Sequence, residues 1–259
     1  GHKVLGKVCD ISAQKQGKGP AIQGEQTLSG KSYGDLFEYT KSGYGNGLAV
    51  TGFRGEKNQT IIFQNRFGNK PVIEIAGSFE STQIEEAILT EGINRISEKA
   101  FANCNKLHQV VLPMSVEEIA DNAFENCYHL KSISLPAMLK TIGIAAFKGT
   151  GLRTIDLPKS VYWIGEALMA DCRDLERITI PDNINRISGS MFEGCTNLKK
   201  INLPDSLSEI GDRAFFGCSS LDFVVIPDSV QQIGQDAFTN TDKQFIIQCS
   251  FGTYAEEYA

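Results

Sequence analysis

The chain has 259 residues, a formal net charge of -6 and 41% hydrophobic residues, which is enough for one large globular domain or two ordinary ones. Its acidic balance disfavours nucleic acid as a partner, because binding to phosphates needs a basic face. No apolar run approaches the length of about 18 residues that a membrane span requires, so we expect no membrane insertion.

The first 80 residues show no regular repeat. Residues 12–35 are rich in Gly, Lys, Gln and Ser, which is typical of a linker, and KVLGKVCDI (3–11) is compatible with a strand. Three strands separated by turns such as SGYGNG, and then a degenerate first repeat, are expected at 37–40, 47–53, 59–64 and 70–79. We therefore predict an N-terminal extension over 1–35 and a β-rich N-terminal cap over 36–80.

From about residue 84 the chain is periodic. An Ala-Phe pair marks the repeat, and its second position recurs at steps of 23, 23, 22, 23, 23 and 23 residues, at Phe101, Phe124, Phe147, Met169, Phe192, Phe215 and Phe238. A period in the twenties is typical of a solenoid. The unit reads L-x-x-I-x-I/L-P-x-x-V-x-x-I-G-x-x-A-F-x-x-C, and about seven rungs fit between 84 and 249.

Each rung is predicted to hold one short strand and one turn. The I-x-I part alternates apolar and polar residues as a strand does, and proline ends it. The A-F-x-x-C part is too short for a full helix and favours a single turn or a 3-10 piece. Burying about six apolar side chains at roughly 2 kcal/mol each cannot offset the ordering of a whole rung at about 1–2 kcal/mol per residue. The rungs must therefore stack and share one core.

Two further columns keep the same period. Glycines follow the last Ile and indicate a corner where a side chain would clash or where φ must be positive, at Gly143, Gly165, Gly211 and Gly234. Cysteines share another rung position, at Cys104, Cys127, Cys172, Cys195 and Cys218, with Cys9 and Cys249 outside the column. Buried free thiols are the favoured interpretation, with disulfides and metal or redox chemistry as alternatives. In the 22-residue rung FKGTGL replaces FENCYHL, and we expect the missing residue to remove that rung's cysteine.

The stretches LKKINLPDSLSEIGDRAFFGC (198–218), LDFVVIPDSVQQIGQDAF (221–238) and FIIQCSFGTYAEEYA (245–259) closely resemble the BspA-like branch of the leucine-rich repeat family. The resemblance implies an α/β solenoid: a right-handed superhelix with a parallel β-sheet on its concave face and short helical or 3-10 turns on its convex side. It implies a solenoid over 81–249 and a C-terminal cap helix within 250–259. It also implies a secreted or cell-surface bacterial protein used in adhesion or host contact, with no shared catalytic residues.

The residues themselves offer no catalytic or metal site. A hydrolytic triad needs a nucleophile, a base and an orienting group, but His108 and His129 occupy different rung positions and are interpreted as surface residues. Glu85 and Glu86 are adjacent, so in a strand they would point to opposite faces. No cysteine has a ligand partner at zinc-binding spacing. We expect no enzyme activity, no cofactor and no metal.

Binding is expected at the variable positions of the solenoid. Two slots in each strand should point out of the sheet, at Glu86/Ile88, Gln109/Val111, Ser132/Ser134, Thr154/Asp156, Arg177/Thr179, Lys200/Asn202 and Phe223/Val225. This stripe has small polar groups in its middle, two cations next and an apolar patch at its C-terminal end. A solvated face without a partner is the alternative.

A second feature lies before the last Ile of each rung, where two residues are polar almost everywhere but one rung has Tyr162-Trp163, including the only Trp of the chain. Exposed Tyr and Trp are enriched at interfaces, although these two could instead cover the neighbouring irregular rung at Thr150-Gly151. The candidate binding surface is Asp156, Tyr162, Trp163, Arg177, Lys200, Asn202, Phe223 and Val225.

These features predict a non-enzymatic recognition or adhesion module that binds a host protein, a matrix component or a glycan. A weak homodimer through Tyr162 and Trp163 is a further expectation. The alternative is a structural spacer without a ligand of its own.

Overall fold

The computed structural model of the protein describes residues 27–28, 31–55 and 60–259, and the chain forms two units, Gly1–Leu36 and Phe37–Ala259. In the described part of the first unit, β1 (Thr27–Leu28) and β2 (Lys31–Ser32) form an antiparallel pair, followed by the 3-10 helix η2 (Tyr33–Leu36). The strand expected at 3–11 and most of the expected linker lie outside the described residues.

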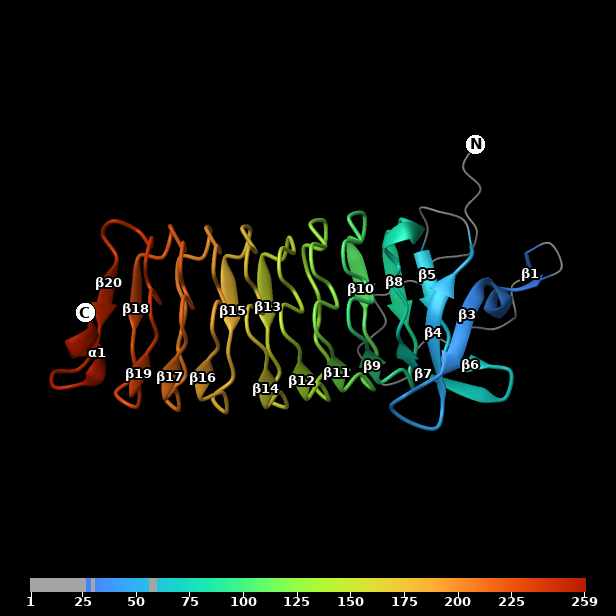
Figure 1. Ribbon diagram of the computed structural model, residues 1–259, viewed down its shortest axis with the longest axis horizontal. Coiled ribbons are helices and arrows are strands. Elements are labelled where there is room, and N and C mark those ends of the chain that lie inside the picture. Colours follow the sequence, from blue (N-terminus) through green and yellow to red (C-terminus); the bar gives the residue numbers. More distant parts are fainter. Residues whose placement is uncertain (1–26, 29–30, 56–59) are drawn as a thin grey trace, which may run out of the picture. The chain divides into compact units, whose positions relative to one another are not determined.

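The second unit starts with five strands around the solenoid entry (Figure 1): β3 (Phe37–Lys41), β4 (Leu48–Phe53), β5 (Thr60–Phe63), β6 (Arg66–Phe67) and β7 (Lys70–Ile75). β3 pairs antiparallel with β4, and β6 with β7, as hairpins do. β5 and β7 instead pair in parallel with the strands that follow them, β5 with β8 and β7 with β9. The parallel repeat architecture therefore already begins within residues 36–80.

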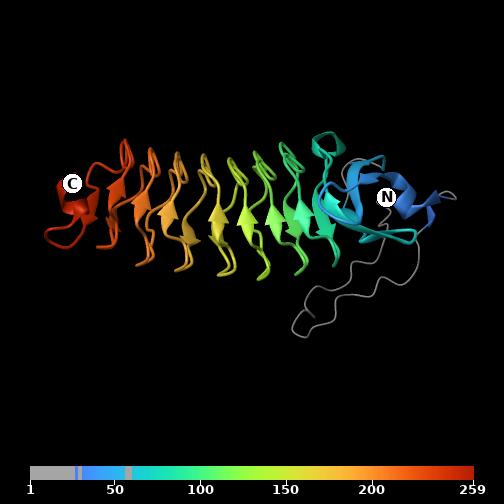
Figure 2. The same ribbon diagram turned by 60° about the horizontal axis from the view of Figure 1, so that its bottom comes forward.

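The rungs carry two parallel ladders (Figures 1 and 2), which run side by side along the solenoid. The long-strand ladder consists of β5, β8 (Glu86–Leu89), β10 (Gln109–Val111), β13 (Thr154–Asp156), β15 (Arg177–Thr179), β18 (Phe223–Val225) and β20 (Ile246–Gln248). The short-strand ladder consists of β7, β9 (Arg95–Ile96), β11 (Glu118–Ile119), β12 (Thr141–Ile142), β14 (Trp163–Ile164), β16 (Arg186–Ile187), β17 (Glu209–Ile210) and β19 (Gln232–Ile233).

The solenoid is longer than predicted and has a second ladder that the sequence analysis did not predict. Residues 132–134 and 200–202 continue the long-strand column without strand pairing, so that the column has about nine positions from β5 to β20 rather than seven. The two helical elements in the described residues of this unit are η3 (Glu80–Thr82) and α1 (Tyr254–Tyr258), so most of the described fold is a β-solenoid and the α/β description is not confirmed. α1 lies within the range predicted for a C-terminal cap helix.

A spine of stacked phenylalanine rings, interrupted by Met169, fills the core. The column residues Phe101, Phe124, Phe147, Met169, Phe192 and Phe215 are fully buried. Successive rings stack at centroid distances such as 5.3 Å for Phe101–Phe124 and 5.1 Å for Phe215–Phe238. This confirms the phase of the repeat and the shared core.

The turn after β7 contains the 3-10 helix η3, but the turns after β9 and the later short strands are not helices, although the sequence analysis expected helical or 3-10 pieces there. Each of these later turns contains two residues with positive φ, one before the Ala-Phe pair or its equivalent and one after it, as at Asn122 (56°) and Asn126 (60°). A left-handed residue interrupts a right-handed helix. Its N–H bonds to the next rung instead, as Asn122 N donates to Ile144 O at 2.8 Å. The turns thus hold the rungs together rather than forming helices of their own.

The glycine column marks a close approach between rungs. A Cβ at Gly143 would lie 2.4 Å from the backbone nitrogen of Asp121, and a Cβ at Gly165 would lie 2.4 Å from that of Ile144. Neither glycine has a positive φ, so the steric explanation holds at these positions.

The cysteine column consists of buried free thiols. The thiol of Cys127 donates to Phe101 O at 3.1 Å, and that of Cys218 donates to Phe192 O at 3.1 Å, each bridging to the preceding rung. Our expectation for the short rung was wrong, because Thr150 takes the cysteine position itself, is buried and lies 3.2 Å from the Cys172 sulfur. The deletion lies after that position, where Gly151 replaces two residues.

Burial makes these thiols unreactive. It raises the pKa of Cys104 and Cys218 to about 12 and that of Cys172 to about 11, and only the thiolate is the nucleophile. In a Cys9→Ser variant at pH 8, we expect a thiol reagent to label Cys249 quickly and the five column cysteines only after unfolding. Rapid labelling of several thiols in the folded protein would contradict the buried column.

Candidate functional site

The predicted binding residues fall on two different ladders. Asp156, Arg177, Lys200, Asn202, Phe223 and Val225 belong to the long-strand column, whereas Tyr162 and Trp163 belong to the short-strand side. No sheet contains strands of both ladders, so the structure does not gather the eight residues into one site.

The long-strand stripe has the predicted register. Thr154 pairs with Arg177 and Asp156 with Thr179, and the residues between them are buried while these four are exposed. The Thr179 hydroxyl donates to the Asp156 carboxylate across the two rungs. The variable residues therefore form an exposed surface along the ladder.

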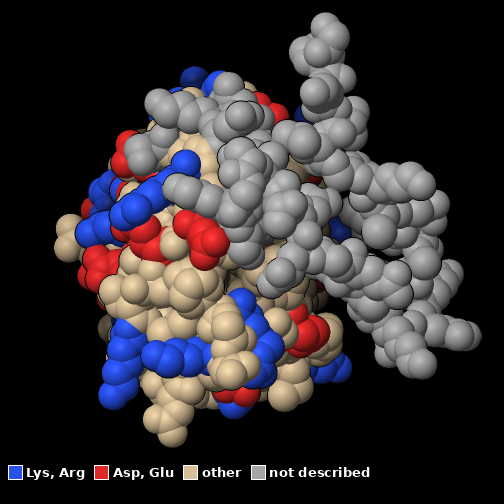
Figure 3. Space-filling model, turned by 90° about the vertical axis from the view of Figure 1, so that its right-hand side faces the viewer, with Lys and Arg blue, Asp and Glu red and all other residues tan. Residues whose placement is uncertain are grey.

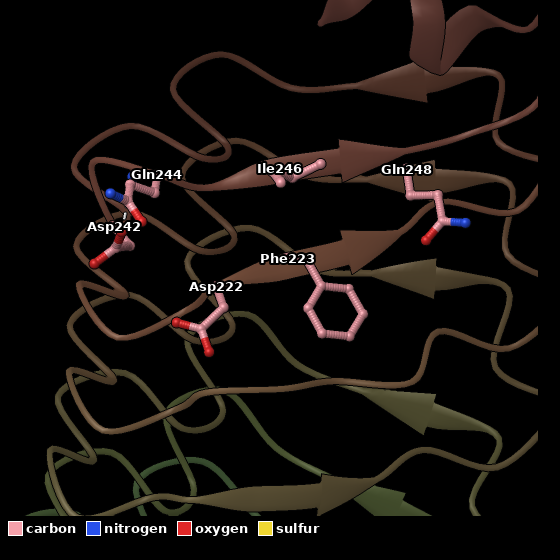
Figure 4. A pocket seen from close by; sticks show the side chains of 6 residues that line it. All are labelled: Asp222, Phe223, Asp242, Gln244, Ile246 and Gln248. Atoms are coloured by element: carbon pink, nitrogen blue, oxygen red, sulfur yellow. Dashed lines mark hydrogen bonds between the residues drawn. The ribbon is translucent and has the colours of Figure 1, made fainter.

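The C-terminal end of this surface is hollowed. A shallow hollow of about 500 Å³ is lined there by Asp222, Phe223, Asp242, Gln244, Ile246 and Gln248, and Figure 4 shows these side chains. Phe223 and Ile246 pair across β18 and β20, and Ile246 is 62% exposed. The ammonium group of Lys200 lies 5.7 Å from the Phe223 ring centroid, within the range of a cation–π interaction. Apolar groups, carboxylates and a cation thus meet at one place.

The sequence analysis found Phe223 and Val225 but missed the rest of the hollow. Ile246 and Gln248 pair with these two residues in the structure, 23 positions further along the chain. Continuing the stripe by one more period would have found them. Asp242 and Gln244 come from the loop before β20, where no repeat position indicates their place.

Tyr162 and Trp163 are 68% and 47% exposed on the short-strand side. They do not fill a space left by the short rung, because Thr150 is buried against Cys172 and a Cβ at Gly151 would lie 2.2 Å from Tyr128 O. The two aromatic side chains are available for a partner.

The two surface histidines lie near one another, although they occupy different rung positions. His108, His129, Glu85 and Lys106 line a second shallow hollow of about 300 Å³. The Nε2 atom of His108 lies 3.6 Å from the carboxylate of Glu86, and His129 contacts Asn105 O. Ser, Thr, Cys and Tyr are absent from the residues lining this hollow.

A buried charged cluster lies between the cap strands and the first rungs. The Glu74 carboxylate accepts hydrogen bonds from Ser42 and Ser97 and lies 3.6 Å from Arg95 Nε, and Arg95 also pairs with Glu118. The exposed ring of Tyr44 stacks on the Arg95 guanidinium at 3.6 Å. Arg95 Nε is buried and has no hydrogen-bond partner, but each charged group of the cluster lies in an ion pair with another, and we interpret the cluster as structural.

Basic side chains gather at the end of the molecule that carries the cap strands. Figure 3 looks onto this end and shows Lys and Arg side chains grouped on its lower part. Among the described residues of the segment from β3 to β7, the exposed basic residues are Lys41, Arg54, Arg66 and Lys70. Arg54 is paired with Glu38 at 2.7 Å, so part of this charge is neutralised within the cap.

In the described ranges, no three His, Cys, Asp or Glu side chains converge in a way that would hold a metal ion. None of the helices in the same ranges has both the length and the apolar character needed to cross a membrane.

Comparison with known proteins identifies the repeat. The family model for the BspA type leucine rich repeat region matches with six copies, over residues 74–149 and 117–245. No curated protein matches the chain.

Several solved structures are similar. A leucine-rich repeat protein from Bacteroides ovatus ATCC 8483 is 31% identical with a TM-score of 0.73, and the match covers 85% of this chain and 61% of that one. The T. pallidum leucine-rich repeat protein is 30% identical with a TM-score of 0.67, covering 72% of this chain and 88% of that one. A leucine-rich cell surface protein from Faecalibacterium prausnitzii A2-165 is 19% identical with a TM-score of 0.36, covering 86% and 95%. This chain thus spans less than two thirds of the Bacteroides ovatus protein.

Proposed function

The chain belongs to the BspA-type leucine-rich repeat family, which is often involved in surface recognition, and we propose that it is a non-enzymatic recognition module of a secreted or cell-surface protein. Its ligand is a host protein, a matrix component or a glycan, held by the variable positions of the solenoid. The repeated apolar residues of each rung are buried in the shared core. The exposed variable residues are therefore the part of each rung that is available for a partner.

The hollow around Phe223 and Ile246 carries this proposal. Large contiguous apolar patches often mark interaction sites. Phe223 and Ile246 pair across β18 and β20, and Val225 lies two residues after Phe223 at 49% exposure. Lys200 lies beside the Phe223 ring, and Asp222 and Asp242 line the hollow. Apolar contact area with charged groups around it is the composition of a protein interface.

The test is a binding screen of the purified chain against immobilised matrix proteins and a glycan array. A Phe223→Ser/Ile246→Ser variant should weaken binding to any hit by at least about tenfold, or roughly 1.4 kcal/mol. A Ser132→Ala/Thr154→Ala variant changes the same stripe in the middle of the ladder and should bind as the unchanged protein does. Thermal unfolding of each variant checks that the fold is retained.

The opposite results are informative as well. Binding that survives the Phe223/Ile246 double substitution would place the ligand elsewhere on the solenoid. A screen without any hit would contradict the recognition proposal and favour the spacer.

A further inference from the structure

The short-strand ladder is open at one place. On either side of it, inter-rung bonds are regular: Tyr162 N donates to Lys140 O at 3.0 Å, and Ser208 N donates to Asn185 O at 2.8 Å. Between them, β14 ends one sheet and β16 begins another, and among the described residues no backbone hydrogen bond joins 162–164 to 185–188. The carbonyls of Tyr162 and Ile164 thus lack the inter-rung bond that the ladder makes elsewhere.

Two residues of the following rung depart from the repeat at this opening. In other rungs a serine hydroxyl reaches the preceding carbonyl, as Ser160 does to Leu139 O at 2.6 Å, but here Asn183 does so through an amide that is one bond longer, to Val161 O at 2.6 Å. Ser188 stands in the glycine column, and its hydroxyl donates to Gly165 O at 2.9 Å. A Cβ at Gly143, Gly165, Gly211 or Gly234 would lie within 3 Å of the preceding backbone. Ser97 and Ala120 nevertheless carry side chains at this position in rungs whose short strands pair, so the longer Asn183 side chain is the departure that accompanies the opening.

The opening adjoins the exposed aromatic pair. Ile164, next to Trp163, is half-buried, whereas its column equivalents such as Ile142 and Ile187 are fully buried. Asn185 and Arg186 are exposed on the facing strand. The site thus presents an indole and a phenol beside main-chain acceptors and an amide side chain.

The charges at this site are already paired. Lys140, in the rung before Tyr162, is bound to Glu117 at 2.8 Å, and Arg186 is bound to Glu209 at 3.3 Å. A charged ligand would find no unpaired counter-ion among these four groups. An uncharged ligand that offers a flat apolar face and many hydroxyls fits the aromatic rings and the free hydrogen-bonding groups best.

We propose that Tyr162, Trp163 and the opened ladder between β14 and β16 form a binding site for a neutral oligosaccharide. A sugar ring stacks on the exposed indole, and its hydroxyls bond to the carbonyls left unpaired at the opening and to Asn185. This proposal rests on the recognition function and names a second surface and a ligand class for it.

The single tryptophan makes the test direct, because any change in tryptophan fluorescence reports on Trp163. The protein is titrated with neutral oligomers of glucose, mannose, xylose and N-acetylglucosamine, and with a sulfated polysaccharide. We expect at least one neutral oligomer to shift the fluorescence with saturation, equally at 0.1 and 0.5 M salt, since an uncharged ligand is not screened. A shift caused only by the sulfated polymer, or no shift at all, would overturn the proposal.

Three variants locate the site. Tyr162→Ser keeps the tryptophan reporter and should weaken binding at least tenfold, whereas Tyr128→Ser removes another exposed tyrosine, at a different rung position, and should change nothing. Asn183→Ser/Ser188→Gly restores the repeat residues, should close the ladder and should also weaken binding at least tenfold. Unchanged affinity in the restored variant would refute the role of the opening.

The outcome is separable from that of the general function. Suppose that a ligand binds the unchanged protein, loses affinity for the Phe223/Ile246 variant and leaves the Trp163 fluorescence unchanged. This result would support the recognition function and contradict the oligosaccharide site.

Discussion

Replacing Phe215 with alanine is expected to lower the free energy of unfolding by about 3–5 kcal/mol, the usual range for a fully buried phenylalanine. Its ring lies between those of Phe192 and Phe238, at centroid distances of 5.2 Å and 5.1 Å. The substitution therefore leaves a cavity in the spine and removes ring contacts in both directions. Urea unfolding followed by circular dichroism measures the loss.

Gln231→Ala is the control, since this side chain is exposed on a neighbouring rung and should change stability by less than about 0.5 kcal/mol. Similar losses for the two variants would mean that the phase of the repeat is misassigned. Because a solenoid is stabilised by contacts between adjacent rungs, the Phe215 variant is also expected to unfold at its C-terminal rungs first.

Replacing Glu74 with alanine is expected to cost about 3–5 kcal/mol, the range for removing one partner of a buried ion pair. Glu74 is 3% exposed, and its carboxylate accepts hydrogen bonds from Ser42 of the cap and Ser97 of the following rung. The substitution would leave both hydroxyls without their acceptor and Arg95 with Glu118 as its remaining carboxylate. The cap would then lose one of the polar contacts that join it to the first rungs, besides those such as Thr60 to Glu86.

Two variants distinguish this cluster from ordinary surface charge. Glu74→Gln keeps an acceptor for the serines and should cost less than the alanine variant. Glu38→Ala breaks an exposed pair with Arg54, whose side chain is 73% exposed, and should cost at most about 1 kcal/mol. A Glu74→Ala protein as stable as the Glu38→Ala protein would show that the cluster adds nothing.

Much of the candidate site followed from the sequence because strand side chains alternate. The spacing of Thr154, Asp156, Arg177 and Thr179 was sufficient to predict that they share an exposed face. It was not sufficient to predict the hollow beyond Phe223, because part of its lining comes from a loop outside the repeat. Nor did it indicate that Tyr162 and Trp163 lie on another ladder, since the second strand of each rung is only two residues long.

The sequence by itself determined the period, the phase of the core and the family, because these depend on residues that repeat in every rung and bury the same faces. Only the tertiary structure decided where neighbouring rungs separate, which residue replaces the missing cysteine and how Glu74 and Arg95 join the cap to the solenoid. The physical reason is that the spacing between two rungs depends at once on several repeat positions at which the two rungs contact each other. A departure such as Asn183 lies beside such an opening through the rung it faces, and this contact has no fixed signature along the chain.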